Sequence, residues 1–218
     1  MKSRDLTRWE RAWWADGLVV AGVDEVGRGP LAGPVVAAVV VFERHCPVAG
    51  VNDSKQLSER QREMLFLRIL DGARAVAVGA AGPRTIEAIN ILEASRVAML
   101  RALGYLGNPP DVLLTDAVAL GGPWREAAIL QGDATSASIA AASIVAKVVR
   151  DRYMRELARQ FPAYGFDRHK GYATRSHRDA ILRHGPCEAH RRTFLRKLLL
   201  ADPAVAESRP PNPVPGAG

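Results

Sequence analysis

The sequence predicts an α/β protein with a mixed central sheet flanked by helices. Within Leu18–Phe42, two runs rich in valine and alanine flank a turn rich in glycine and proline, which is the pattern of a buried β-hairpin. The short apolar run Val112–Asp116 follows a helical segment. A crossover connection would pair this run in parallel with the first strand, so the sheet is expected to be mixed.

The first elements follow from local patterns. Asp5–Trp14 is predicted to form a short helix whose tryptophans pack on the body of the protein. Ser58 is a good N-cap for a helix after the hairpin. The apolar face of that helix is expected to combine Leu57, Met64, Leu65 and Ile69.

Later elements alternate between strand and helix. Ala75–Ala81 is predicted as a strand, and Pro83–Leu103 as a helix that contains Asn90. Ala127–Gln131 is expected to be a short strand, and a long helix is expected from Thr135–Ser138 to about Gln160. The apolar face of the Pro83–Leu103 helix is predicted to consist of Ile86, Ile89, Leu92, Val97 and Leu100.

Length and composition indicate one large domain, or a domain with an appendage. The chain has 218 residues, of which 48% are hydrophobic. No apolar run reaches the ~18 to 20 residues of a membrane span, and the charged N-terminus is unlike a signal peptide. A cytoplasmic protein without membrane contact is therefore expected. Cys46 and Cys187 are isolated thiols without metal-ligand spacing.

Positive charge is concentrated in one part of the chain. The net charge is +7, and Ile144–Leu200 holds 14 Lys and Arg against 5 Asp and Glu. This surplus of +9 leaves −2 for the rest of the chain. Such a region is typical of a polyanion partner, although a solvated basic helical face has the same composition.

Carboxylates follow the predicted strands at points where an apolar run ends. Asp24 and Glu25 close the first strand, Asp116 closes the fourth, and Asp133 precedes the long helix. Separate caps and loop acids are the alternative, most strongly for Asp133. Carboxylate oxygens suit Mg²⁺ and Mn²⁺, and two such ions ~4 Å apart promote phosphodiester hydrolysis. An acidic cluster beside a basic region indicates a nuclease.

The long helix also carries a polar stripe. Ser143, Lys147 and Arg150 share one face by their spacing, which could bind a phosphate backbone. Further basic clusters follow at 168–170 and 190–192. The histidines have no zinc-site spacing, so phosphate contact or capping is the better interpretation.

These motifs, taken together, resemble those of bacterial ribonuclease HII, the type 2 ribonuclease H family. The resemblance spans roughly Leu18–Phe194. It is carried by V-D-E-V-G-R-G-P-L-A-G-P-V, D-S-K-Q-L-S, I-N-I-L-E-A-S-R-V-A-M, the strand-end Asp116, G-D-A…S-I-A-A-A-S-I-V-A-K-V-V-R-D and K-G-Y-A-T…G-P-C-E-A-H-R.

The resemblance implies a ribonuclease H-like fold in residues 1–160, with an N-terminal helix at 5–14, and a helical substrate-binding extension in 161–200. Residues 201–218 are expected to be a disordered Pro-rich tail. The resemblance also implies endonucleolytic cleavage of RNA in RNA–DNA hybrids and at ribonucleotides embedded in duplex DNA. Two-metal hydrolysis with Mn²⁺ or Mg²⁺ would leave 5′-phosphate and 3′-hydroxyl ends.

Residue roles carry over position by position. The resemblance makes Asp24, Glu25, Asp116 and Asp133 the four metal-binding catalytic carboxylates. It implies that Gly27, Arg28 and Gly29 grip the ribonucleotide and its 2′-hydroxyl through backbone groups, and that Tyr172 stacks on the next sugar. Substrate or structural contacts are implied for Lys55, Ser143, Lys147, Arg150 and His190.

The sequence departs from the family pattern at a few positions. Ala117 stands where glycine is usual, and Cys187-Glu188-Ala189 replaces serine-proline-isoleucine. The tail lacks a glutamine-plus-aromatic box for a sliding clamp, and a monomer is expected. Two alternatives are another nuclease or transposase of the same superfold, and a hybrid-binding protein without catalysis. The second would be expected to have lost one of the four acids, and none is replaced.

Overall fold

A computed structural model describes residues 5–44, 48, 50–51, 54 and 57–200 of the chain. Within these ranges, no helix is both long enough and apolar enough to cross a membrane. The predicted tail, 201–218, and Lys55 and Cys46 lie outside the described residues.

The core of the protein is a five-stranded mixed sheet with the strand order β3-β2-β1-β4-β5. Strands β1 (Val20–Val26), β2 (Val35–Phe42) and β3 (Ala73–Ala81) pair in antiparallel fashion. Strand β4 (Val112–Asp116) pairs in parallel with β1, and β5 (Arg125–Ile129) pairs in parallel with β4. The predicted hairpin, crossover and mixed sheet are therefore confirmed, although β5 begins and ends two residues earlier than the predicted Ala127–Gln131.

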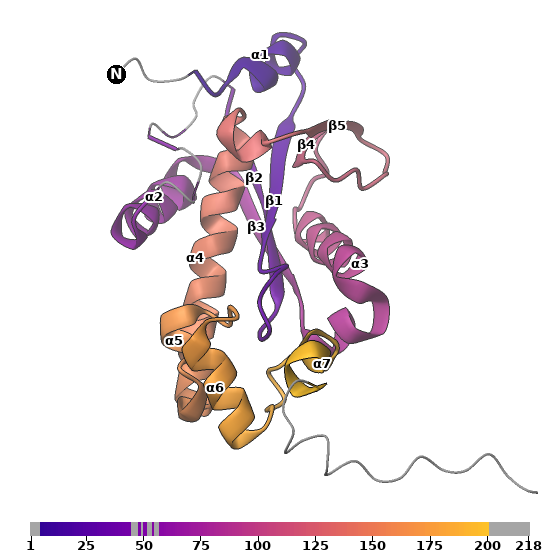
Figure 1. The fold of residues 1–218 in the computed structure, drawn as a ribbon. Helices are drawn as coiled ribbons and strands as arrows, with labels where there is room; N and C mark the ends of the chain where they lie inside the picture. Colours follow the sequence, from indigo (N-terminus) through magenta and orange to yellow (C-terminus); the bar gives the residue numbers. More distant parts are fainter. Residues whose placement is uncertain (1–4, 45–47, 49, 52–53, 55–56, 201–218) are drawn as a thin grey trace, which may run out of the picture.

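Helices cover both faces of the sheet (Figure 1). The long helix α4 (Ala137–Gln160) and α2 (Glu59–Gly72) cover one face, and α3 (Pro83–Gly104) covers the other. Helix α4 crosses β1 closely, because a Cβ on Gly22 would lie 2.1 Å from the backbone carbon of Ser138. Any side chain at position 22 would push the helix off the sheet.

The apolar face predicted for α3 is only partly right, because Ile86 is buried as expected whereas Ile89, Leu92 and Leu100 are not. Asn90 has φ 67° and ψ 170°, and its side-chain oxygen accepts hydrogen bonds from the N–H groups of Leu92 and Glu93. Asn90 therefore ends one helical segment and caps the next, so the helical phase is reset there. The second segment buries mainly small residues, and the larger Ile89, Leu92 and Leu100 are exposed.

Helix α2 starts as the sequence indicates. Ser58 and Gln61 form a reciprocal capping box at its N-terminus. Leu65 and Ile69 are buried as expected, whereas Met64 is exposed and Phe66 takes the buried position instead. The predicted N-terminal helix is α1 (Arg8–Ala15).

Helix α1 contributes to the end of α4 nearest the acidic strand ends. The buried Glu10 accepts hydrogen bonds from the hydroxyl of Ser136 (2.6 Å) and the N–H of Ser138 (2.9 Å). A carboxylate at a helix N-terminus stabilises the helix through its unpaired N–H groups. Trp14 is buried in the core, as expected for a packing residue.

Helices follow α4 up to residue 200. They are the short η3 (Pro162–Tyr164) and α5 (Phe166–His169), then α6 (Arg175–His184) and α7 (Arg192–Leu200). They pack around a separate small core with the last turns of α4 and with Ala32 from the β1–β2 loop. This arrangement brings residues 161–200 against the loop that carries Gly27, Arg28 and Gly29 (Figure 1).

Candidate active site

Three of the four predicted carboxylates line one cavity at an edge of the sheet. Val23 and Thr115 are parallel partners in β1 and β4, so the next residues, Asp24 and Asp116, lie side by side. The cavity has a volume of about 400 Å³. It is lined by Asp24, Glu25, Val26, Ser54, Arg62, Asp116, Ser143, Lys147 and Tyr172.

Asp133 lies next to this cavity without lining it. It belongs to the short helix η2 (Gly132–Ala134) just before α4, and it is buried. The N–H of the preceding Gly132 donates to Asp116 Oδ1 at 2.9 Å. The backbone at Asp133 therefore also fixes the carboxylate of Asp116.

Burial and mutual repulsion shape the acidic cluster. The pKa of Asp24 lies well above its ordinary value because the side chain is desolvated, and the nearby Glu25 and Asp116 charges raise it further. Burial also raises the pKa of Glu25, an effect that the neighbouring Arg28 opposes. Glu25 Oε2 is buried and has no hydrogen-bond partner among the described residues. An added cation would compensate both groups.

The donor set fits a hard divalent cation in part. Among the described residues, no group of three or more Asp, Glu, His or Cys side chains is arranged so that it could hold a metal ion by itself. Mg²⁺ usually takes one or two carboxylates and completes its shell with waters and substrate phosphates. Asp24, Glu25 and Asp116 line one cavity, so one or two of these carboxylates could supply the protein ligands of such a shell.

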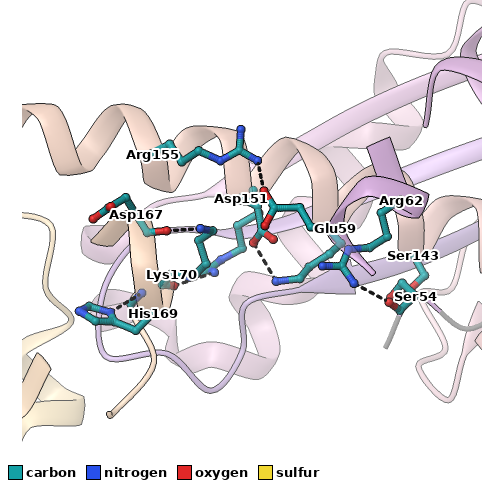
Figure 2. Close-up of polar contacts among 12 residues, drawn as sticks. Ser54, Glu59, Arg62, Ser143, Asp151, Arg155, Asp167, His169 and Lys170 are labelled. Carbon is teal, nitrogen blue, oxygen red and sulfur yellow. Dashed lines mark hydrogen bonds and ion pairs between the residues drawn. The ribbon is translucent and has the colours of Figure 1, made fainter. Parts of the chain in front are cut away.

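Polar side chains from α4, from α2 and from Ser54 before it also line the cavity, and Figure 2 shows Ser54, Arg62 and Ser143 together. The hydroxyl groups of Ser54 and Ser143 are 2.8 Å apart, and Arg62 Nη1 donates to the carbonyl of Ser54 at 3.0 Å. Lys147 Nζ lies 2.7 Å from Asp151 Oδ1. Ser143 and Lys147 were predicted at the site, whereas Ser54 and Arg62 were missed. Their signal was the D-S-K-Q-L-S segment, which places Arg62 one turn into α2.

The structure removes Arg150 from the predicted phosphate-binding stripe of α4. Its side chain is 0% exposed and donates to the carbonyls of Ala32, Pro34 and Lys170. The residue lies on the inner side of the β1–β2 loop and cannot reach a phosphate from there. Spacing on a helix identifies a shared face, but residues three and four apart diverge enough for Lys147 to line the cavity while Arg150 enters the core.

His190 is likewise a buried residue and not an exposed substrate contact. Its Nδ1 accepts the N–H of Cys187 at 3.1 Å, which leaves the proton on Nε2. That N–H faces His177 Nε2 at 3.1 Å, and His177 Nδ1 in turn donates to the carbonyl of Tyr172 at 2.9 Å. Of the two roles left open by the sequence, the structure favours the structural one.

The predicted sugar-reading segments reach the cavity region. Tyr172 is 42% exposed and lines the cavity with the carboxylates. Arg28 and Gly29 are exposed at the tip of the loop, and no atom lies within 4 Å of where a Cβ on Gly29 would be. This open space would admit a substrate close to the backbone.

Two solved ribonucleases are similar to this chain in fold. A crystal structure of ribonuclease H2 from Pyrococcus horikoshii matches with TM-score 0.69 and 30% identity, over 83% of this chain and 97% of the other. The RNase HII in a PCNA complex from Archaeoglobus fulgidus matches with TM-score 0.67 and 28% identity, over 80% and 94% of the two chains. The fold and the acidic strand ends thus define a nuclease of the ribonuclease H class.

Sequence comparison gives the family. The model of the family described as ribonuclease HII matches residues 21–198. Ribonuclease HII of Bacillus licheniformis is 48% identical over 190 residues, which cover 87% of this chain and 74% of the relative. Ribonuclease HII of Bacillus anthracis is 48% identical over 194 residues, covering 88% and 76%. The chain belongs to the ribonuclease HII family, whose members are metal-dependent endonucleases.

Proposed function

We propose that the protein cleaves the RNA strand of RNA–DNA hybrids and incises duplex DNA at embedded ribonucleotides. The observation that carries the proposal is the shared cavity. It holds the buried Asp24, the partly buried Glu25 and Asp116, a lysine and an exposed tyrosine, so one phosphate and its neighbouring sugar can be engaged together. Family membership supports the same substrate class.

The cleavage step is hydrolysis of a phosphodiester bond that leaves 5′-phosphate and 3′-hydroxyl ends. Asp24, Glu25, Asp116 and Asp133 are the proposed ligands of two Mg²⁺ or Mn²⁺ ions. When bound, such ions activate a water molecule and stabilise the charge on the leaving oxygen.

The other side chains hold the substrate. Lys147 is oriented by Asp151 at the cavity wall and is proposed to contact a phosphate oxygen next to the cleaved bond. The backbone at Gly27, Arg28 and Gly29 is proposed to contact the ribose 2′-hydroxyl, because metals and phosphates cannot distinguish RNA from DNA. Tyr172 is proposed to pack on the next sugar.

The test compares three duplexes of one sequence: all DNA, DNA with a single ribonucleotide, and a full RNA–DNA hybrid. We expect cleavage of the second and third but not the first, with Mg²⁺ or Mn²⁺ and without cleavage in EDTA. Asp116→Asn should reduce the rate by several orders of magnitude. The matched control is Asp111→Asn, about 17 Å away at the other end of the same strand.

The result that would contradict the proposal is cleavage of the all-DNA duplex at a comparable rate, which would indicate another nuclease of the same fold. Tight hybrid binding without cleavage in either metal would indicate a binding protein. Near-full activity of Asp116→Asn with saturating Mg²⁺ would refute the ligand assignment alone.

A further inference from the structure

The loop between β1 and β2 is held from its buried side by Arg191. The side chain is 0% exposed. Its three guanidinium nitrogens each donate to a backbone carbonyl of this loop. The acceptors are Gly33 (3.0 Å from Nε), Arg28 (2.9 Å from Nη1) and Gly27 (2.6 Å from Nη2).

Arg150 holds the same loop and extends to the turn that carries Tyr172. It donates from Nε to the carbonyl of Pro34 (2.9 Å) and from Nη2 to that of Ala32 (3.1 Å). Its Nη1 donates to the carbonyl of Lys170 at 3.0 Å, and its Cζ lies 5.9 Å from the centre of the Tyr172 ring. One buried side chain therefore contacts both segments that face the substrate.

The close packing of Arg150 against the loop requires a glycine at position 27. Its φ is +96°, and a Cβ on it would lie 2.3 Å from Arg150 Nε. Only glycine lets the arginine approach the backbone this closely. The space beside Gly29 is open. Gly27 therefore admits Arg150 on the buried side of the loop, whereas Gly29 leaves room on its exposed side.

The two arginines are costly as purely structural supports. Among the described residues, neither forms an ion pair with a carboxylate. Burial and the neighbouring Arg150 charge lower the pKa of Arg191 to about 9. Apolar packing usually holds a turn at a lower cost than buried charge. A role in function accounts for two buried charges at this loop.

Peptide geometry links the buried side of the loop to its exposed side. In a trans peptide, the C=O of one residue and the N–H of the next point in opposite directions. Since the carbonyls of Gly27 and Arg28 point inward to Arg191, the N–H groups of Arg28 and Gly29 point outward. Both N–H groups make no hydrogen bond within the described part of the chain.

We propose that Arg191 and Arg150 are positioning residues for recognition of the ribose 2′-hydroxyl. By fixing the loop carbonyls from behind, they aim the N–H groups of Arg28 and Gly29 at the substrate. Arg150 also keeps these groups in register with Tyr172. This inference rests on the proposed function, because it assigns the cause of ribose recognition at that same site.

The test is Arg191→Lys, which keeps the charge but lacks the three-directional guanidinium. Binding is measured for two duplexes that differ by one 2′-hydroxyl, with Asp116→Asn as the parent so that neither is cut. We expect the ratio of the two Kd values to fall about tenfold, the value of one hydrogen bond. Affinity for the all-DNA duplex should stay unchanged. The matched control, Arg196→Lys on the exposed side of α7, should keep the parent ratio.

Three outcomes overturn the inference. An unchanged ratio in Arg191→Lys would refute it, and so would an equal loss of affinity for both duplexes, which a purely structural role predicts. A parent ratio of one would overturn the proposed function together with the inference. If Arg191→Lys does not fold, as judged by urea unfolding, the same measurement on Arg150→Lys decides.

Discussion

Asp24 and Arg150 are both buried ionisable side chains, but their surroundings differ. Asp24 faces a cavity with two other acids, where its pKa is raised by desolvation and repulsion. Arg150 is surrounded by backbone carbonyls that satisfy its donors inside the protein. An acidic cluster with a buried oxygen that lacks a partner among the described residues, that of Glu25, is suited to bind a ligand. A cation whose donors are satisfied by carbonyls is suited to position the backbone that carries them.

Removing one carboxylate should stabilise the metal-free protein. Asp24→Asn relieves repulsion with Glu25 and keeps an oxygen that can accept the N–H of Glu25, which now binds Asp24 Oδ1 at 2.8 Å. We expect Tm in EDTA to rise by about 2–4 °C, equivalent to about 1 kcal/mol for a protein of this size. Cleavage should be lost. Calorimetry with and without Mg²⁺ measures both states.

The change in Tm on adding Mg²⁺ distinguishes relief of repulsion at the metal site from a general packing effect. Wild-type protein should gain more in Tm from Mg²⁺ than Asp24→Asn does, because the ion binds only the folded site. Asp111→Asn should gain as much as wild type. A lower Tm for Asp24→Asn in EDTA, or an equal gain from Mg²⁺, would show that Asp24 is held by the fold and not strained by its neighbours.

At the scale of elements, the sequence predicted most strands and helices but not all of their buried faces. Continuous apolar runs, the Gly- and Pro-rich turn and the Ser58 cap were sufficient for the hairpin, β4, α2 and α4. The phase of α3 was missed because Asn90 resets it with an αL-like φ, which no periodicity reveals. After Asn90, mainly Ala and Ser fill the contact with the sheet together with Met99, whereas Leu92 and Leu100, which a hydrophobic pattern weights strongly, are exposed.

The site was predicted to a similar extent. The strand-end carboxylates were found because charge at the end of a buried strand is costly and therefore informative. Arg150, Arg191 and His190 could not be placed, since a basic residue in a basic segment gives no sign of burial. Gly27 was linked to close approach by the substrate, whereas the structure shows a close approach by Arg150.

The buried histidine pair makes the C-terminal helices sensitive to acid. Desolvation lowers the pKa of His177 and of His190 from 6.5 to about 4. The neighbouring His169, whose ring stacks on that of His177 with the centroids 4.3 Å apart, lowers both pKa values further. Since the folded state holds both rings neutral, their contribution to stability is complete above pH 6.5 and is lost as the pH falls toward 4.

His177→Gln should therefore flatten the pH dependence of stability. Glutamine can still accept the His190 N–H but does not titrate. We expect the free energy of unfolding of wild type to fall more than that of His177→Gln between pH 7 and 4.5, by up to about 3 kcal/mol. Urea unfolding in EDTA at each pH measures it. The raised pKa values of Asp24 and Glu25 act in the opposite direction and cancel in the comparison. Parallel curves for the two proteins would contradict the prediction.

At the scale of the molecule, the basic surplus after Ile144 is divided among three uses. Arg150 and Arg191 are buried. Arg152 and Arg155 pair with Glu63 and Glu59 of α2, so the side of α4 next to α2 is neutralised (Figure 2 shows the Arg155 pair). The remaining basic residues include those of α5–α7 and Lys147, which lines the cavity while it is paired with Asp151. The sequence surplus thus overstates the charge that faces a nucleic acid.

Salt dependence of binding should reveal which cations meet phosphates. Each phosphate neutralised contributes about −0.9 to the slope of log K against log salt on B-form DNA, and a hybrid should be of similar order. Lys147→Ala should reduce the magnitude of the slope by about one unit, because Lys147 lines the cavity that holds the acids. Arg155→Ala, two turns further along α4, should leave it unchanged, because α2 already neutralises this residue. Fluorescence anisotropy with a labelled hybrid, in Asp116→Asn protein from 50 to 300 mM salt, measures both slopes.

Equal reductions in the two variants would show that α4 binds phosphate along its whole length, and an unchanged slope in Lys147→Ala would assign this lysine to Asp151 alone.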